Sequence, residues 1–285
     1  MLSVDADPIL QPDEQVLEYA ESSIGTDAAS STTSISSSIL NYRHENGRTY
    51  HRYKDGKYHL PNDQVENERL DLQHHLFLLT FGDKLGLAPP NDPGAKVGRV
   101  LDVGTGTGIW AIDYADEHPE AEVIGVDLSP IQPAFNLQPG GYAEFQEIGG
   151  IIVSDDGTLT PDHALSKWCS LLGEAFTKLG CTSIEFGKIK AIMQEVGFDD
   201  VVDKRFKWPT NPWPRDKKYK ELGTWNYHNS SNALESLTLA SFTRAHGWSR
   251  DEVIRFLVDV RKDLHNPSVH AYNPICSIYG KKPDI

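Results

Sequence analysis

The chain has 285 residues and a formal net charge of −14 at pH 7, which argues against a broad nucleic-acid surface, because such a surface needs a basic face. Its three cysteines, Cys169, Cys181 and Cys276, are far apart, which argues against a zinc site or a disulfide scaffold and favours a reducing compartment. We find no signal peptide and no long apolar run, so we expect no membrane span and a cytoplasmic or nuclear protein.

The N-terminal part divides into a polar tail and an aromatic arm. Residues 1–38 are predicted to be disordered, because residues 21–40 are rich in Ser and Thr and hold few large apolar residues. One folded domain is expected over residues 39–285, with residues 39–97 as an N-terminal arm and helix. Residues 41–58 are rich in Tyr, Arg and His without a clean helical or strand period, and they could cross a ligand cleft or form a structural strap.

A helix is predicted over residues 63–85, starting at the Pro61-Asn62-Asp63 turn. One side of this helix carries Leu70, His74, Phe77 and Leu78. Asp71, His74 and His75 lie about one turn apart, as a pair of metal ligands would. Because no third ligand is in sight, we predict ordinary polar contacts and no metal site.

The most informative stretch runs from Arg99 to Ser129. Residues 100–103 are a short apolar run that predicts a buried parallel strand, and residues 121–126 predict a second strand. Between them, residues 109–118 have helical spacing. Three glycines separate the first strand from this helix: Gly104, Gly106 and Gly108. They allow a tight turn and bring a ligand close to the backbone and to the free N–H groups of the helix.

Two acidic residues indicate the kind of ligand. Asp127 ends the second strand about 20 residues after the glycines, where a carboxylate suits ribose hydroxyls. Asp102 lies just before Gly104, and a carboxylate there suits a cationic ligand better than a pyrophosphate. The G-x-G-x-G spacing also differs from the dinucleotide pattern G-x-G-x-x-G. The alternative is a strand–helix–strand unit with a glycine turn and no ligand.

This stretch resembles motif I of class I S-adenosylmethionine (SAM)-dependent methyltransferases. The resemblance implies that SAM is the cofactor, that the glycine turn packs against its methionine part, and that Asp127 holds its ribose. The implied cofactor-binding residues are Asp102, Gly104, Thr105, Gly106, Gly108, Asp127 and Leu128.

Many separate elements resemble the LaeA-like family of fungal methyltransferases. They are residues 48–53 (RTYHRY), 60–63 (LPND), 68–74 (ERLDLQH), 137–147 (LQPGGYAEFQE), 154–159 (SDDGTL), 207–214 (KWPTNPWP), 260–264 (VRKDL) and 270–274 (HAYNP). Together they cover most of residues 40–283. The family implies an α/β class I methyltransferase fold, a Rossmann-like sheet with helices on both faces, here over residues 98–285 with C-terminal helical additions. It also implies a link to fungal secondary metabolism or development.

The chain departs from the family after Pro133. Family members have a further segment there, which supplies two strands, two helices, the acidic turn that faces adenine and part of the substrate wall. Here residues 128–141 are only 14 residues with three prolines, so they hold at most a short helix. We therefore expect a sheet shortened by two strands.

Three outcomes are open for this shortened sheet. In the first outcome, residues 142–148 take the position of the missing strands and pair directly with residues 100–103, since the connection is long enough. Alternatively, the sheet can keep a gap with unpaired strand edges and exposed apolar faces, which invites aggregation or partner binding. The third outcome is a sequence from a gene model that skipped an exon.

The remaining pattern is that of an intact C-terminal half. Helices are predicted over 161–179, 184–196, 217–245 and 250–264, and strands over 201–208 and 271–280. The last strand is expected to run antiparallel beside residues 201–208. In the first of these helices, the apolar face carries Leu165, Trp168, Leu172 and Phe176.

No catalytic residue is identified. Methyl transfer from an activated sulfonium depends mostly on placement in a dry cleft, and it needs a base only for a hydroxyl or a protonated amine. The candidate bases, each of which could be a structural residue instead, are His51, His74, Tyr227 and His228. Trp208, Trp213 and Trp225 could line an aromatic acceptor pocket or pack in the core.

Two functions follow from the sequence. The first is a SAM-dependent methyltransferase of LaeA type that methylates a small metabolite or a protein. The second is a methyltransferase-like regulatory subunit without turnover that acts through a protein partner, which the missing segment favours. A dehydrogenase is a distant third, because the glycine spacing counts against it.

Overall fold

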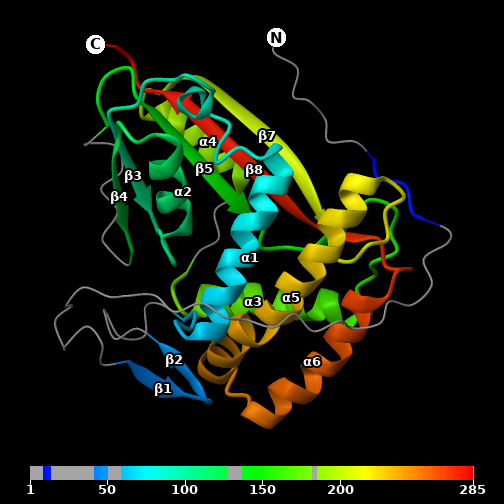
Figure 1. Ribbon diagram of the computed structural model, residues 1–285. Helices are drawn as coiled ribbons and strands as arrows, with labels where there is room; N and C mark the ends of the chain where they lie inside the picture. The colour runs from blue at the N-terminus through cyan, green and yellow to red at the C-terminus, as the bar shows by residue number, and fades with distance from the viewer. Residues whose placement is uncertain (1–8, 14–41, 51–58, 128–136, 182–184, 285) are drawn as a thin grey trace.

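The structure is a computed structural model that describes residues 9–13, 42–50, 59–127, 137–181 and 185–284 (Figure 1). Its helices and strands, in chain order, are β1 (Arg43–Glu45), β2 (Arg48–Tyr50), α1 (Gln64–Phe81), a 3-10 turn (Pro89–Asn91), β3 (Arg99–Val103), α2 (Ile109–Glu117), β4 (Glu122–Val126), β5 (Tyr142–Ile148), β6 (Val153–Ser154), α3 (Ala164–Lys178), α4 (Phe186–Glu195), β7 (Asp199–Pro209), α5 (Lys217–Ala245), α6 (Arg250–His265) and β8 (Ala271–Lys281). These bounds confirm the helices and strands predicted after residue 60, apart from small shifts at their ends.

Strand β8 is the centre of the main sheet. It pairs antiparallel with β5 and β6 along one edge and with β7 along the other, which confirms the predicted antiparallel neighbour of residues 201–208. Helices α1 and α5 cover one face of this sheet through the cluster of Leu76, Trp208, Leu222 and Ile275. Helix α4 covers the other face, where Ile189 and Met193 pack on Cys276 and Ile278. The predicted α/β fold with helices on both faces is therefore confirmed.

The C-terminal helices have a hydrophobic core of their own. Helices α3, α5 and α6 pack together in the lower part of Figure 1. Leu165, Trp168 and Leu172 of α3 are buried in this core and Phe176 is partly buried, as their spacing predicts. A capping box formed by Ser249 and Glu252 begins α6 by satisfying backbone N–H groups in its first turn.

Strands β3 and β4 form a separate two-stranded parallel sheet, with Val103 opposite Val126 (Figure 1). Within the described residues, no strand pairs with the other edge of β3. The expectation that residues 142–148 could pair with residues 100–103 is wrong, because every residue of β5 is paired with β8 instead. The sheet keeps a gap, as the second outcome predicted.

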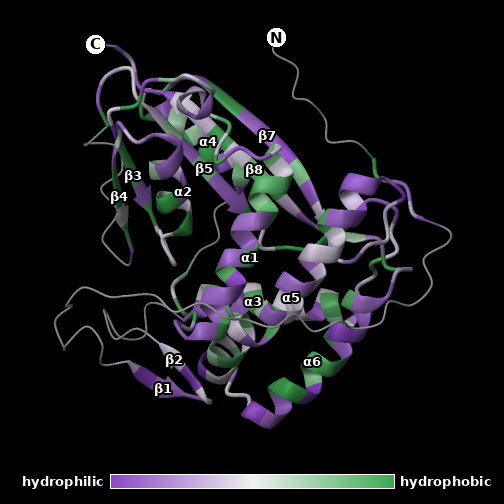
Figure 2. Cartoon of the chain, viewed as in Figure 1, coloured by the Kyte–Doolittle hydropathy of each residue, from purple (hydrophilic) through white to green (hydrophobic). Residues whose placement is uncertain are grey.

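The prediction that residues 100–103 form a buried strand is wrong as to burial, because the gap leaves apolar side chains of β3 at the surface. On β3 and β4, Leu101, Val103 and Ile124 are 43, 50 and 48% exposed. Figure 2 shows green, hydrophobic segments on this two-stranded sheet. Alternation along β3 places Leu101 and Val103 on the face opposite to Asp102. This exposed apolar face is the one expected for a sheet that lacks its central strands.

A loop joins the β3–α2–β4 unit to the main sheet in place of strand pairing. The Glu144 carboxylate on β5 accepts hydrogen bonds from the backbone N–H groups of Leu87 and Ala88, each at 2.8 Å. The carbonyl oxygen of Leu85 accepts from Trp110 Nε1 on α2 and from Gln146 Nε2 on β5, also at 2.8 Å. The loop around residues 85–88 therefore holds α2 to β5.

The aromatic arm contains a hairpin that its sequence period does not predict. Strands β1 and β2 pair antiparallel around Asn46 and Gly47, whose φ angles of 53° and 83° are those of a tight turn. Asn-Gly is the typical sequence signal of this turn, so the Asn46-Gly47 pair indicates the hairpin where the period of the surrounding residues does not. Arg48 then ties the hairpin to α1 through an ion pair with Asp63.

Five residues of the predicted tail are described. Pro12 forms an isolated bridge with Pro214, and the Asp13 N–H donates to the Trp213 carbonyl at 2.7 Å. The rest of residues 1–38 lies outside the described residues, and the division of the domain into residues 39–97 and 98–285 stays a prediction.

Candidate functional site

The three predicted glycines form the turn between β3 and α2. Gly104, Gly106 and Gly108 have φ angles of 80°, 54° and 82°, a region that L-residues with a side chain rarely adopt. The N–H of Gly104 donates to the Val126 carbonyl at 2.7 Å, so the turn lies directly at the end of β4. Gly108 caps α2 without a side-chain hydrogen bond, which leaves the N-terminal N–H groups of this helix available to a ligand.

Asp127 lies beside this turn. Its Oδ2 accepts a hydrogen bond from the Gly106 N–H at 2.8 Å, and its side chain is exposed. Gly125, two residues earlier, is needed for the same arrangement, because a Cβ there would lie 2.7 Å from Thr105 Oγ1. The structure thus brings Thr105, Gly106 and Asp127 together, as the predicted site requires. Leu128 lies outside the described residues.

Asp102 faces the same turn and carries an unsatisfied acceptor. Its Oδ2 is buried and has no hydrogen-bond partner among the described residues. Burial raises the pKa of this carboxyl, the nearby Thr105 hydroxyl opposes the rise, the neighbouring Asp127 carboxylate adds to it, and His74 opposes it. A buried carboxylate oxygen without a partner is costly, so it fits a ligand that supplies a cationic donor, such as the ammonium group of an amino acid.

Helix α1 lies against the glycine turn. Thr107 Oγ1 donates to Asp71 Oδ1 at 2.7 Å, and His74 Nε2 lies 2.8 Å from Asp113 Oδ2 on α2. The Leu70 side chain would be 3.4 Å from a Cβ on Gly106. The ordinary polar contacts predicted for Asp71 and His74 are confirmed. The sequence does not predict that this side of α1 covers the turn, because helical spacing does not say what a helix packs against.

The other candidate bases are not brought to this turn. Tyr227 packs against His265 of α6, with ring centroids 5.5 Å apart, and against its neighbour His228 at 5.6 Å. His51 lies outside the described residues. His74 is therefore the described candidate that contacts the site.

The predicted aromatic pocket is mostly core. Trp208 is fully buried, and its Nε1 donates to Thr80 Oγ1 at 2.6 Å. Trp213 donates to the Ala271 carbonyl at 2.9 Å. Trp225 is partly buried against His75, at 5.0 Å between ring centroids. For Trp208 and Trp213 the alternative of core packing therefore holds.

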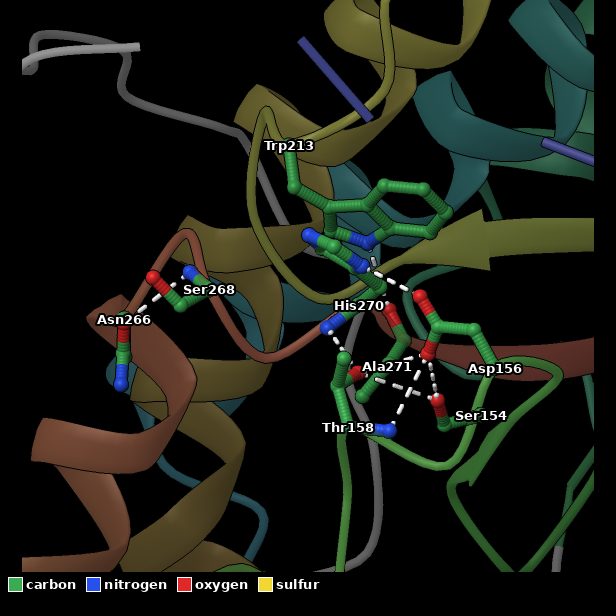
Figure 3. A network of polar contacts seen from close by, with 8 residues as sticks. All are labelled: Ser154, Asp156, Thr158, Trp213, Asn266, Ser268, His270 and Ala271. Carbon is green, nitrogen blue, oxygen red and sulfur yellow. Dashed lines mark hydrogen bonds and ion pairs between the residues drawn. The ribbon is translucent and has the colours of Figure 1, made fainter. Parts of the chain in front are cut away.

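A second polar network connects the loop after β6 to the start of β8 (Figure 3). Asp156 accepts hydrogen bonds from Ser154, Thr158 and His270, and the His270 ring lies 4.9 Å from that of Trp213. Burial would raise the pKa of Asp156, but the hydrogen bonds from His270, Ser154 and Thr158 outweigh it and hold this pKa far below its usual range. Residues 154–158 and 270–274, which carry part of the family resemblance, thus form a structural tie.

Neither a metal centre nor a membrane-spanning helix is found among the described residues. They contain no group of three His, Cys, Asp or Glu side chains placed to hold a metal ion. None of the described helices has both the length and the apolar character that crossing a bilayer requires.

Comparisons with known proteins identify relatives of this chain. No family model matches the chain. Methyltransferase pytC of Aspergillus terreus is 35% identical over 304 residues, which cover 90% of this chain and 93% of the relative. Secondary metabolism regulator laeA of Aspergillus flavus is 32% identical over 310 residues, which cover 91% of this chain and 82% of the relative. A solved phosphoethanolamine N-methyltransferase 2 of Haemonchus contortus covers 76% of this chain and 52% of its own, but its TM-score of 0.36 and identity of 14% are too low to carry weight.

The alignment lengths also bear on the shortened sheet. Nine-tenths of the 285 residues is about 257, so about 47 of the 304 positions aligned with pytC have no counterpart in this chain. A deficit of this size agrees with the predicted absence of a segment. With 35% identity over nearly the whole relative, the chain belongs to the LaeA-like family of methyltransferases.

Proposed function

We propose that this protein is a SAM-dependent methyltransferase of LaeA type, cytoplasmic or nuclear, that acts in secondary metabolism on a small-molecule or protein acceptor. The observation that carries this proposal is the glycine turn between two carboxylates, with a buried oxygen of Asp102 left without a partner. Family membership supports the same conclusion, since relatives at 32–35% identity are named as methyltransferases and as regulators of secondary metabolism.

Each residue of the site has a role in this proposal. Asp127 would exchange the Gly106 N–H for the ribose hydroxyls of SAM. Asp102 would accept from the ammonium group of its methionine part. Thr105 and the backbone of Gly104, Gly106 and Gly108 would pack against that part of the cofactor.

The chemistry asks little of the protein beyond placement. SAM supplies an activated methyl group on a sulfonium, so the chain has to orient it and exclude water. Helix α1 is positioned to help, because Leu70, Asp71 and His74 lie over the glycine turn. A proton acceptor is required only when the acceptor atom carries a proton that must leave.

A regulatory subunit without turnover is the second candidate. It is favoured by the edge of β3 that no described strand covers and by the exposed Leu101, Val103 and Ile124. Unpaired edges and apolar faces of this kind serve partner binding. In this case the protein would act through a regulatory protein partner.

A gene replacement separates the two candidates. Asp127→Ala removes the proposed ribose contact, and Asp116→Ala, an exposed aspartate on α2, is the matched control. With equal protein levels confirmed by immunoblotting, an enzyme predicts that Asp127→Ala loses the production of secondary metabolites while Asp116→Ala retains it. Full production with Asp127→Ala would overturn the enzyme and leave the regulatory subunit.

A further inference from the structure

Residues 9–13 lie beside the start of α5, as a short blue segment next to the yellow helix in Figure 1. The Asp13 N–H donates to the Trp213 carbonyl at 2.7 Å. The Arg215 N–H donates to the Gln11 carbonyl, also at 2.7 Å. Two hydrogen bonds that run in opposite directions between antiparallel segments are the pattern by which a peptide adds to an exposed backbone edge.

Two prolines face each other at the centre of this contact. Pro12 forms an antiparallel bridge with Pro214, between the two hydrogen bonds. Proline has no N–H group and a fixed φ angle, so it fits a position at which the backbone donates no bond, and it loses little freedom on docking. The next residue, Asp13, forms an ion pair with Lys220 in the first turn of α5. The contact therefore suits a proline followed by an acidic residue.

The edge that receives this segment is held by the rest of the fold. Trp213 is 4% exposed, its Nε1 donates to the Ala271 carbonyl, and its ring packs on His270 (Figure 3). After the edge, the Asp216 side chain caps α5. The Trp213 carbonyl and the Arg215 N–H are therefore fixed by contacts that do not involve residues 9–13, and an edge that is preorganised in this way binds a peptide at a lower entropic cost.

The charge around the edge favours an acidic peptide. Four basic residues lie between positions 215 and 220, and Asp216, the acid among them, caps α5. Within the described residues, the segment is held mainly by two backbone hydrogen bonds and by the ion pair of Asp13 with Lys220, whose side chains are 22 and 28% exposed. A contact of this size depends on the high local concentration that attachment to the same chain provides, so a separate peptide can compete for the edge.

We propose that residues 213–215, together with Lys220, form a binding site for an extended peptide that carries a proline followed by an acidic residue. Residues 11–13 are its intramolecular ligand, and a partner protein that presents a segment of the same chemistry displaces them. The N-terminal segment then sets how much partner the protein binds. The contact shares no residue with the glycine turn, so this inference is independent of the proposed function.

Fluorescence anisotropy tests this inference, with a labelled peptide of residues 8–16 as the probe and the full chain as the receptor. Asp13→Lys in the chain places like charges against each other at Lys220 and opens the edge. Glu174→Lys makes the same charge change at an exposed position on α3 and is the matched control. A second peptide carries Asp13→Lys and tests whether the acidic residue is recognised.

We expect the natural peptide to bind the Asp13→Lys chain about ten-fold or more tightly than the wild type or Glu174→Lys, because the intramolecular segment competes in those two chains. The peptide with Asp13→Lys should bind the opened chain about ten-fold more weakly than the natural peptide does. Adding Lys220→Glu to the Asp13→Lys chain restores opposite charges and should close the edge again. Equal binding of the natural peptide to the wild type, Asp13→Lys and Glu174→Lys would overturn the inference.

Hydrogen exchange shows whether the edge is open. The Arg215 amide should be protected in the wild type, lose protection in Asp13→Lys and regain it when the peptide is added. Should it stay protected in Asp13→Lys, Asp13→Pro takes its place, because it removes the N–H donor as well as the carboxylate. An opened edge that binds no peptide would overturn the inference. Protection of Arg215 that neither variant removes, or that is absent from the wild type, would also overturn it.

Discussion

The carboxylate of Glu144 is predicted to hold the β3–α2–β4 unit to the main sheet. It accepts hydrogen bonds from the N–H groups of Leu87 and Ala88 at 2.8 Å and from Ser277 Oγ at 2.7 Å. Hydrogen bonds to a charged acceptor contribute about 1.5–3 kcal/mol each. Glu144→Gln keeps the shape of the side chain but turns an NH2 group toward N–H donors, so one or two of these bonds are lost. We expect the free energy of unfolding to fall by about 2–4 kcal/mol.

Urea denaturation followed by tryptophan fluorescence measures this change. Glu147→Gln is the matched control, since Glu147 lies on the same strand but is exposed on the other face, and we expect it to change stability by less than about 0.5 kcal/mol. Hydrogen exchange gives a local readout, because the amides of Leu87 and Ala88 should lose protection in Glu144→Gln. A loss of stability no larger than that of Glu147→Gln would refute the role of this loop as the joint.

Three further substitutions test other parts of the structure. Gly106→Ala places a side chain at a φ of 54°, which strains the backbone of the turn, and 3.4 Å from Leu70. SAM affinity measured by calorimetry should therefore drop about ten-fold or more. Unchanged affinity would contradict the geometry of the turn. Val103→Thr changes a half-exposed position, so it should leave thermal stability nearly unchanged and reduce self-association in analytical ultracentrifugation. Leu257→Thr, in the buried core, should instead lower the free energy of unfolding by about 2–4 kcal/mol. The pKa of Asp156 in the folded protein lies below its unfolded value, so the stabilisation by its carboxylate is present above about pH 4 and is lost as the pH falls further. Asp156→Asn should therefore lower the free energy of unfolding at pH 7 and make it depend less on pH in acid. An acid-unfolding curve that parallels the wild type would contradict this role.

The parts of the fold predicted best are those with a strong local signal. Residues 99–127 combine a short apolar run, glycines that only a turn explains and an acid at the end of the second strand, so sequence alone places Asp102, Gly106 and Asp127 together. The long helix α5 and the strands β7 and β8 also lie where the sequence predicts them.

The parts that sequence could not predict depend on contacts between distant residues. The buried side of α1 carries an ion pair between Glu66 and Arg69, which binds Asn229 on α5, so a polar stripe is in the core. The joint at Glu144 and the contact of His74 with Asp113 are likewise set by tertiary packing. Whether β5 would pair with β3 or with β8 was also undetermined, because both pairings satisfy the same apolar pattern.

The most direct test is calorimetric titration of SAM into the full 285-residue chain, its Asp127→Ala variant and the Asp116→Ala control. We expect one site per chain. Its affinity for SAM should be unchanged in Asp116→Ala and weakened about 30-fold or more in Asp127→Ala, as expected when about 2 kcal/mol of charge-assisted hydrogen bonding is lost. A folded wild type that binds no SAM, or an Asp127→Ala variant that binds it as tightly as the wild type, would contradict the assignment of the glycine turn as the cofactor site.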